Sequence, residues 1–329
     1  MFKVGLDIGY GHTKVVTEDG KRIIFPSIAK KGEAIDLDNL LGAKEDYIIN
    51  INDTTWYIGK MAQKESSFAT RAYEQTDRYN DEAFQAMLST ALSLATQGEE
   101  TDVMLVTGLP LSIYETSQKE FSSFLKCYSA HTELNGISKE VRVKDAIVFP
   151  QAGGIFFSPS CTDIKKNLPE NSLITVIDIG YRTTDCATFN YIKGSFQFLI
   201  ENSFTLDVGM SSVFKRLSRT IAKKIGAIDI SLEDSEAVFH KGFCFKDNQP
   251  IYISDDIIQL KKSIANNINE GYRSNAGQSA KINNVILAGG GSIALKDELL
   301  NIFPEAISVA DTQMANALGF LSIAHRFDL

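Results

Sequence analysis

The sequence LDIGYGHTK at residues 6–14 recurs in altered form as IDIGYRTTD at residues 177–185. The two copies lie 171 residues apart, measured from Asp7 to Asp178, in a chain of 329 residues. Each copy is an apolar strand that reaches an aspartate, then a glycine-containing turn, then hydroxyl residues that lead into a second strand. Because a glycine turn lets backbone N–H groups approach an anion closely, the repeat predicts two loops that bind opposite sides of a polyphosphate and its metal ion.

The composition is that of a soluble globular protein, with 44% apolar and 22% charged residues. The length suits two domains of ordinary size. A formal net charge of −8 disfavours a large nucleic-acid surface, because neutralising phosphates requires clustered lysine and arginine. We therefore expect no direct nucleic-acid binding, and any DNA partner to be reached through an adaptor protein.

The cysteines and the apolar segments predict a cytoplasmic protein. The four cysteines are scattered and form no CxxC pair, which disfavours a disulfide framework or a zinc site and favours reduced thiols. Asp7 interrupts the first apolar run, so no signal-peptide core fits there. No run of about 18 apolar residues occurs, so no membrane-spanning helix is expected.

Three strands are expected to open each half of the chain. Their predicted ranges are 2–8, 13–16 and 22–25, and then 173–179, 186–191 and 196–200. Strand–turn–strand units at equivalent places predict two similar α/β domains. Each domain carries a predicted polar insertion, at about 31–75 in the first and about 227–254 in the second. The first insertion contains a hairpin signal, Asn52-Asp53.

Apolar periodicity predicts the helices. One covers 81–96 and turns an apolar face toward a core. Another begins at a cap on Ser211 or Ser212 and runs to Ile225, where Gly226 ends it. Further helices are expected over 255–268, from about 295, and over 313–325. The last of these is expected to return to the first domain.

Two aspartates end apolar strands, where a carboxylate is poorly solvated unless it meets a cation, water or backbone donors. These are Asp7 and Asp178, and we expect both to hold a divalent metal, largely through its water shell, as magnesium usually prefers. The alternative is that each carboxylate caps its own turn. The duplication favours the metal site, because the two aspartates stand at the same place in both phrases.

The two loops differ in charge at their last position. Lys14 closes the first loop, where its positive charge can neutralise terminal phosphates, whereas Asp185 stands at the same place in the second. Thr13, Thr183 and Thr184 offer hydroxyls to phosphate oxygens, and the alternative for them is ordinary β-propensity. The asymmetry predicts one loop that binds phosphate and one that holds metal and water.

A third nucleotide-type element follows a predicted strand at 284–288. It consists of Gly289, Gly290, Gly291 and Ser292 and precedes a helix. Backbone at such a turn can lie flat against a base or sugar, and a helix N-terminus favours anions. The chain contains no GxxxxGK[ST] P-loop, and no GxGxxG fingerprint follows a strand.

With these elements the chain resembles the actin superfamily, which also includes heat-shock chaperones and sugar kinases. It is most similar to the prokaryotic plasmid actin-like ATPases of the ParM/StbA kind and to their archaeal relatives. Five family elements occur in order: a first phosphate loop at 7–14, a connection at 150–154, a second phosphate loop at 178–185, an adenosine element at 289–292 and a second connection at 315–319. The resemblance covers nearly the whole chain.

The resemblance implies a fold of two similar ribonuclease-H-like α/β domains that flank a nucleotide cleft. Domain I would comprise 1–155 and 320–329, and domain II would comprise 156–319. The implied cofactors are ATP and Mg²⁺, with GTP left open as the nucleotide.

The resemblance also implies roles for single residues. Gln151 would position the attacking water, and Asp178 would assist through metal and water. Asp7 would hold magnesium through water, and Lys14 would bind the β- and γ-phosphates, so that catalysis rests on positioning and electrostatics. The other implied nucleotide-binding residues are Gly9, Tyr10, Gly11, His12, Thr13, Gly180, Tyr181, Arg182, Thr183, Thr184, Lys215, Gly289, Gly290, Gly291 and Ser292.

Some of these assignments carry alternatives. Lys215 fits a solvated helix face equally well. His12 and Arg182 are larger than the residues usual in such loops. Arg182 could reach phosphate or a neighbouring protomer, and His12 could lie on the surface.

Three functions share this fold. The first is an ATPase that polymerises head to tail with itself into filaments, for plasmid segregation or intracellular positioning. The second is a small-molecule kinase of the sugar type, and the third is a non-polymerising, nucleotide-gated scaffold. A kinase needs a carboxylate base near its acceptor hydroxyl, whereas Gln151 suits the orienting of water. A chaperone needs a second domain for its substrate, and we expect none in this chain. The filament-forming ATPase, without membrane binding, is therefore favoured, and it is the resemblance to the family that implies the head-to-tail filament.

Overall fold

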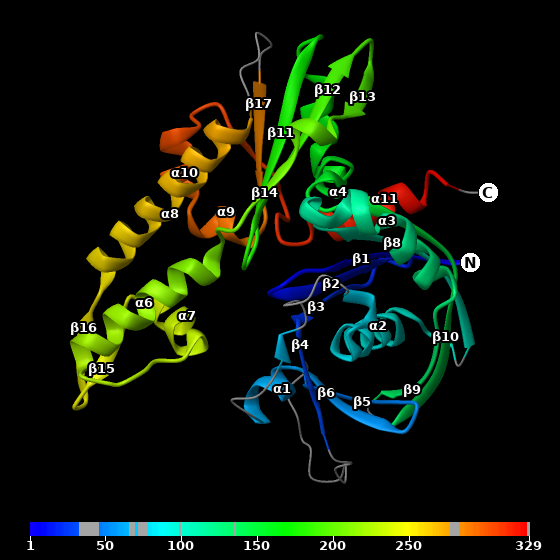
Figure 1. The fold of residues 1–329 in the computed structure, drawn as a ribbon, viewed down its shortest axis with the longest axis horizontal. Helices are drawn as coiled ribbons and strands as arrows, with labels where there is room; N and C mark the ends of the chain where they lie inside the picture. Colours follow the sequence, from blue (N-terminus) through cyan, green and yellow to red (C-terminus); the bar gives the residue numbers. More distant parts are fainter. Residues whose placement is uncertain are drawn as a thin grey trace. The chain divides into compact units, whose positions relative to one another are not determined.

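The computed structural model describes residues 1–32, 46–65, 70–71, 78–98, 100–134, 136–276 and 283–327. The chain divides into two units, one made of Met1–Asn167 with Met314–Leu329 and the other of Leu168–Gln313. Figure 1 traces both units along the sequence. Each unit is built around its own sheet.

The first unit contains a ten-stranded mixed sheet. Its strands are β1 (Phe2–Ile8), β2 (His12–Thr17), β3 (Arg22–Pro26), β4 (Ile28–Lys31), β5 (Asp46–Ile51), β6 (Thr54–Gly59), β7 (Thr70–Arg71), β8 (Glu100–Leu109), β9 (Ser129–Leu134) and β10 (Ile137–Pro150). They are ordered β3-β2-β1-β8-β10-β9-β5-β6-β4-β7. Strand β1 runs antiparallel to β2 and parallel to β8, which itself runs parallel to β10. The strands predicted at 2–8, 13–16 and 22–25 are confirmed.

Most helices of the first unit contact this sheet. They are α1 (Lys60–Glu65), α2 (Glu82–Ala95), α3 (Leu111–Lys126), α4 (Gly153–Phe156), α5 (Thr162–Lys166) and α11 (Ala315–Ala324), with 3₁₀ turns at Arg78–Asn80 and Pro159–Cys161. The sheet curves around α2, which contacts β1, β2, β4, β5, β6, β9 and β10 (Figure 1). Helix α2 is therefore the centre of the unit's core.

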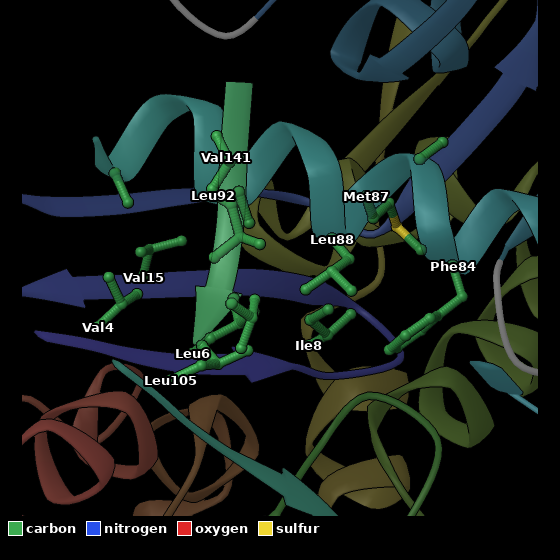
Figure 2. Close-up of a cluster of buried hydrophobic side chains, with 14 of the residues drawn as sticks. Val4, Leu6, Ile8, Val15, Phe84, Met87, Leu88, Leu92, Leu105 and Val141 are labelled. Atoms are coloured by element: carbon green, nitrogen blue, oxygen red, sulfur yellow. The ribbon is translucent and has the colours of Figure 1, made fainter. Parts of the chain in front are cut away.

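Helix α2 confirms the predicted helix over 81–96. It starts where the Asp81 side chain accepts a hydrogen bond from the Ala83 N–H, and it ends at Thr96. Figure 2 shows its apolar side chains against the neighbouring strands, where these residues are fully or almost fully buried: Val4, Leu6, Ile8, Val15, Phe84, Met87, Leu88, Leu92, Leu105 and Val141. Burial of each such aliphatic side chain contributes about 1.5–3 kcal/mol.

The hairpin predicted at Asn52-Asp53 is confirmed. Strands β5 and β6 pair in a register that places Ile51 opposite Thr54. Asn52 and Asp53 have φ of 46° and 63°, the two positive values that a type I′ turn requires. This hairpin joins the ten-stranded sheet. Of the insertion predicted at about 31–75, the structure describes 31–32, 46–65 and 70–71, and the other residues lie outside the described ranges.

Helix α11 belongs to the first unit although it comes last in the chain. It packs on β1 and on α4. A Cβ at Gly5 would lie 2.2 Å from the Ala317 carbonyl oxygen, and one at Gly319 would lie 1.8 Å from the Gly154 carbonyl oxygen. Glycine at these positions allows the backbones to approach this closely.

The second unit contains a smaller mixed sheet. Its strands are β11 (Ser172–Ile179), β12 (Thr184–Ile192), β13 (Ser195–Phe198), β14 (Phe204–Leu206), β17 (Asn283–Ala288) and β18 (Ile307–Ser308). They are ordered β13-β12-β11-β17-β18, with β14 paired to β12. Strand β11 runs antiparallel to β12 and parallel to β17. The predicted strands are confirmed except that the third ends at Phe198, because a 3₁₀ turn occupies Ile200–Asn202.

The remaining elements of the second unit are helices and one separate hairpin. The helices are α6 (Met210–Ile225), α7 (Leu232–Lys241), α8 (Ser254–Asn275), α9 (Gly290–Ala294) and α10 (Lys296–Ile302). The hairpin is formed by β15 (Phe243–Lys246) and β16 (Gln249–Tyr252). The polar segment predicted as an insertion at 227–254 thus contains α7 and this hairpin. Helix α8 is longer than the predicted 255–268.

The predicted cap of α6 at Ser211 or Ser212 was wrong. The N-cap is Gly209, and no side chain caps the helix. A Cβ at Gly209 would lie 2.7 Å from the Tyr181 carbonyl oxygen. Because the turn between β11 and β12 approaches this closely, only glycine fits at the N-cap. The predicted end is confirmed, since Gly226 closes the helix with φ of 78°.

The helix predicted from about 295 is confirmed by α10, and the short helix α9 precedes it as an element that was not predicted. Helix α9 begins at Gly290, inside the glycine run, and α10 follows from Lys296. Among the described residues, no helix has both the length and the apolar character needed to cross a bilayer.

Candidate functional site

The turn between β1 and β2 brings Asp7 and Lys14 together. The Gly9 N–H donates to the His12 carbonyl oxygen at 3.1 Å and closes the turn. The strand register then places Asp7 opposite Lys14, and Lys14 Nζ lies 2.9 Å from Asp7 Oδ2. The side chains are 4% exposed for Asp7 and 17% for Lys14. The lysine therefore neutralises a carboxylate that is almost entirely removed from water.

Gln151 completes this cluster from a distant part of the chain. It follows β10, and its Nε2 donates to Asp7 Oδ1 at 3.0 Å. Its backbone N–H donates to the Leu109 carbonyl oxygen at 2.7 Å. The two oxygens of Asp7 thus bind two of the predicted site residues, the amide of Gln151 and the ammonium of Lys14.

Thr13 does not join the cluster. Its side chain is fully buried, and its hydroxyl shares a 2.9 Å hydrogen bond with the Ser27 hydroxyl. Because side chains alternate along a strand, Thr13 lies on the opposite face of β2 from Lys14. The Gly11 carbonyl oxygen accepts from the Ser27 N–H at 3.0 Å. Ser27 therefore anchors this loop from the side away from Asp7.

The other residues of the first loop lie near the turn. Tyr10 is partly buried and packs against the core around α2. His12 is also partly buried, at the first position of β2. A Cβ at Gly9 would lie 3.3 Å from Lys14 Nζ, so a side chain there would crowd the lysine.

The turn between β11 and β12 has the same backbone geometry. The Gly180 N–H donates to the Thr183 carbonyl oxygen at 2.9 Å. The register places Asp178 opposite Asp185, where the first unit has its aspartate and lysine. Asp185 is 6% exposed. Its Oδ1 accepts from the Thr205 hydroxyl at 2.5 Å, and its Oδ2 accepts from the Thr183 hydroxyl at 3.3 Å.

The raised pKa of Cys186 is partly due to the negative charges at this turn. Burial is the main cause that raises the pKa of the Cys186 thiol well above its usual value, and the charges of Asp185 and Asp178 raise it further. Directly opposed like charges in a sheet destabilise each other. A cation bound at this pair of carboxylates would therefore be favoured electrostatically.

Three other predicted residues of the second loop have partners of their own. The Thr184 hydroxyl donates to the Val208 carbonyl oxygen at 2.7 Å. Arg182 Nε lies 3.6 Å from Asp207 Oδ1, and both side chains are exposed. The ring of Tyr181 packs against Phe214 of α6, with 6.1 Å between the ring centroids. Lys215 is exposed on α6.

The glycine run meets the second loop directly. Gly289 has φ of 81°, and a Cβ there would lie 2.2 Å from Asp178 Oδ1. A Cβ at Gly291 would lie 2.3 Å from Ile179 Cγ2. The Ser292 hydroxyl donates to the Gly289 carbonyl oxygen at 2.8 Å, which holds the turn at the start of α9. The structure thus brings this element against Asp178.

Each turn by itself carries groups of the kind that bind magnesium or phosphate, although among the described residues no three acidic, histidine or cysteine side chains gather as a metal site. Asp7, Asp178 and Asp185 offer carboxylate oxygens, the hard ligands that Mg²⁺ takes while keeping several waters. The missing Cβ at Gly9 leaves Lys14 Nζ uncovered, and the missing Cβ at Gly289 leaves Asp178 Oδ1 uncovered. Lys14 supplies the positive charge that a phosphate needs.

Two residues of this site were missed as candidates. Asp185 was noted only for its charge, but its place seven residues after Asp178 matches that of Lys14 after Asp7. That shared spacing across a hairpin turn is a signal of cross-strand pairing. Gly209 left no such signal, because its need for a missing Cβ arises from the loop folded against it.

Comparison with known proteins now identifies the family. A family model described as the N-terminal domain of actin-like proteins matches residues 5–154, and one described as the C-terminal part of the archaeal actin homologue, MreB-like, matches 176–301. An archaeal actin homologue from Thermoplasma acidophilum is 31% identical over 99% of both chains. This chain belongs to the archaeal actin homologues. The resemblance to actin-like proteins is thereby confirmed.

Solved structures show the same fold for this actin homologue. A subunit of a 15-stranded ParM filament from Clostridium botulinum matches with a TM-score of 0.87 and 26% identity, over 99% of both chains. An archaeal actin homologue in complex with ADP matches with a TM-score of 0.83 and 26% identity, over 99% of this chain and 100% of the other. The predicted fold of two α/β domains of the actin type is confirmed.

Proposed function

We propose that this actin homologue is an ATPase that binds ATP with Mg²⁺ through both phosphate loops and polymerises with itself. The observation that carries the proposal is the cluster of Asp7, Lys14 and Gln151, which joins a cation, a carboxylate and a neutral amide in one buried place. Such a set suits phosphoryl transfer to water, which depends on positioning and charge. The ADP complex of a relative supports the choice of nucleotide.

The residues of the two loops take separate roles in this proposal. Lys14 turns from Asp7 to the β- and γ-phosphates and neutralises their charge. Asp7 and Asp178 hold the magnesium, with Asp185 beside Asp178, and Gly289 lets the nucleotide backbone approach. When bound, the metal supplies charge neutralisation of the phosphates. Gln151 orients the attacking water, and its neutral amide offers no base for a kinase reaction on a hydroxyl acceptor.

Assembly is proposed from the relatives. The ParM match is a filament, and a head-to-tail contact between identical subunits propagates without closure. We propose that ATP favours assembly and hydrolysis favours disassembly, in a cytoplasmic role such as plasmid segregation or positioning. A DNA-binding adaptor would then link the filament to its cargo.

Phosphate release and sedimentation test the proposal together. Purified protein is incubated with Mg²⁺ and ATP, GTP or no nucleotide, and pelleted at increasing protein concentration. We expect ATP-dependent pelleting and steady phosphate release. A protein that stays monomeric at high concentration contradicts polymerisation. ADP formation that requires added sugars, without matching phosphate release, contradicts the ATPase in favour of the kinase.

The variant Asp178→Ala tests the second loop. We expect kcat for phosphate release to fall about a hundredfold, because the carboxylate proposed to hold the metal beside the reacting phosphate is lost, while ADP affinity changes little. Isothermal titration measures the binding and a phosphate assay measures turnover. Asp163→Ala, at an exposed carboxylate, is the matched control with unchanged turnover. Normal turnover in Asp178→Ala contradicts its assignment.

A further inference from the structure

We infer that the turn between β11 and β12, residues 180–183, and the start of helix α6 form one coupled unit, so that a phosphate bound at the turn also fixes the first residues of the helix. This coupling rests on the proposed nucleotide binding and deepens it. It links occupancy of the second phosphate loop to α6, and it depends on the glycine at position 209.

Helix α6 begins without a side-chain cap, and its N-cap is Gly209. The first N–H groups of a helix have no partner inside the helix and need an acceptor elsewhere. Here the Met210 N–H donates to the Gly180 carbonyl oxygen at 3.1 Å. The Ser211 N–H donates to the Tyr181 carbonyl oxygen at 2.6 Å. The backbone of the turn therefore supplies the cap that no side chain provides.

The peptide groups of the turn have their donors and acceptors on opposite sides. The described residues contain no cis peptide bond, and in a planar trans peptide the carbonyl and the N–H point in opposite directions. The carbonyls of Gly180 and Tyr181 point toward α6. The N–H groups of the same two peptide planes, those of Tyr181 and Arg182, therefore point away from the helix. Successive N–H groups arranged in this way bind anions, so the proposed phosphate lies on the side of the turn opposite to α6.

Gly209 lets the turn and the helix approach this closely. A Cβ there would lie 2.6 Å from the carbonyl carbon of Arg182 and 2.7 Å from the carbonyl oxygen of Tyr181. Because these atoms belong to the backbone, they cannot rotate aside as the end of a side chain can. A further bond joins the same two segments, since the Thr184 hydroxyl donates to the Val208 carbonyl oxygen at 2.7 Å. Any side chain at position 209 would therefore push the turn and α6 apart.

The first phosphate turn is anchored in a different way. Its Gly11 carbonyl oxygen accepts from the Ser27 N–H at 3.0 Å, and Ser27 lies between the ends of β3 and β4. The first turn is thus held by a strand connection, whereas the second is held by the start of a long helix. Coupling to a helix is therefore inferred for the second turn.

Helix α6 leads from the turn to other parts of the second unit. It continues from Met210 to Ile225, a length of about 24 Å. The ring of Phe214 lies 6.1 Å from that of Tyr181 in the turn and 5.6 Å from that of Phe239 in α7, between centroids. A phosphate that fixes the turn thus fixes a helix that also packs against α7 (Figure 1). Because coupling between two sites is reciprocal, a contact that displaces α6 weakens phosphate binding at the turn.

Hydrogen exchange resolved to single amides tests the coupling in the native protein. We expect ADP with Mg²⁺ to slow exchange of the Met210 and Ser211 N–H groups about tenfold, because local opening of the helix start is suppressed. The control is the Ala83 N–H, which donates to the Asp81 side chain at the start of α2 and should keep its rate. Isothermal titration of the same sample measures ADP binding. A lack of binding contradicts the proposed function and the coupling with it, whereas binding that leaves both rates unchanged overturns the coupling alone.

Alanine variants of the glycines at the two ends of α6 test the role of Gly209. The Gly180 N–H donates to the Thr183 carbonyl oxygen within the turn. In Gly209→Ala we expect this N–H to exchange about tenfold faster without nucleotide, and the Kd for ADP to rise about tenfold, a usual size for coupling between sites.

Gly226→Ala is the matched control for this variant. Gly226 has φ of 78°, and a Cβ there meets no described atom within 4 Å, so alanine strains the end of α6 without touching the turn. We expect a lower unfolding temperature, with unchanged exchange at Gly180 and unchanged ADP affinity. Equal effects of the two variants, or native exchange at Gly180 in Gly209→Ala, overturn the role of Gly209, because loss of helix stability alone would then explain the result.

Discussion

The turn after β1 and the turn after β11 are built alike but carry different charges. Each is closed by a glycine N–H that donates to a carbonyl oxygen three residues later, from Gly9 in the first unit and from Gly180 in the second. Each register pairs the strand-ending aspartate with the residue seven positions on. In the first unit that partner is Lys14, and in the second it is Asp185.

This difference separates the two halves of the proposed site by function. The ion pair of Asp7 and Lys14 is electrically balanced, so the lysine can move to a phosphate only if another cation compensates the buried carboxylate. Asp178 and Asp185 place two carboxylates opposite each other, an arrangement that a bound cation stabilises. In the proposed function, the turn with Lys14 therefore binds phosphate and the turn with Asp185 binds the metal, although the two backbones are alike.

The largest expected effect comes from breaking the balanced pair. Lys14→Met leaves the Asp7 carboxylate buried without its ammonium, and we expect the free energy of unfolding to fall by about 3 kcal/mol in urea titrations. Lys14→Met/Asp7→Asn should recover much of this loss. The exposed pair of Lys166 and Asp163 supplies the control, because Lys166→Met should leave stability unchanged. Equal stability of Lys14→Met and the native protein would mean that the pair is not buried.

The second largest effect is expected from substitutions of the glycines beside the two aspartates, Gly289 and Gly9. Gly289→Ala meets Asp178 Oδ1 at 2.2 Å and must adopt φ of 81°, so we expect a loss of about 2 kcal/mol and of ADP binding. Gly9→Ala meets its nearest atom, the His12 carbonyl oxygen, at 3.2 Å, and should be tolerated far better. Thermal unfolding and titration with ADP measure both. Equal losses in the two variants contradict the difference between the turns.

The smallest effect concerns the like-charged pair. Asp185→Asn keeps the shape of the side chain and removes its repulsion with Asp178, so the metal-free protein should gain about 0.5 kcal/mol. Adding Mg²⁺ with ADP should raise the unfolding temperature of Asp185→Asn by less than that of the native protein. Removing the Mg²⁺ with EDTA should then lower the unfolding temperature of the variant by less as well. Asp163→Asn controls for loss of surface charge. An undiminished magnesium effect contradicts a role for Asp185 at the metal.

Local sequence patterns were sufficient to predict an element wherever a few neighbouring residues decide its structure. The hairpin at Asn52-Asp53 needs two positive φ values, and asparagine and aspartate tolerate them. Helix α2 needs a cap at Asp81 and a repeating apolar face, and both are visible in the sequence. The start of α6 was mispredicted because Gly209, rather than a serine hydroxyl, is selected by the loop folded against it.

The sequence by itself determined the two repeated turns, the order of the family elements and the position of Gln151 after a strand, because these depend on local residue order. Only the tertiary structure decided that Gln151 binds Asp7, which lies 144 positions earlier in the chain, that Thr13 hydrogen-bonds to Ser27, and that Ala152 adopts a positive φ of 63°. The physical reason is that a hydrogen bond or a clash between distant segments depends on where the sheet places them. The repeated phrase predicts two turns of the same kind, and the register across each turn places a lysine against the aspartate in the first and a second carboxylate against it in the second.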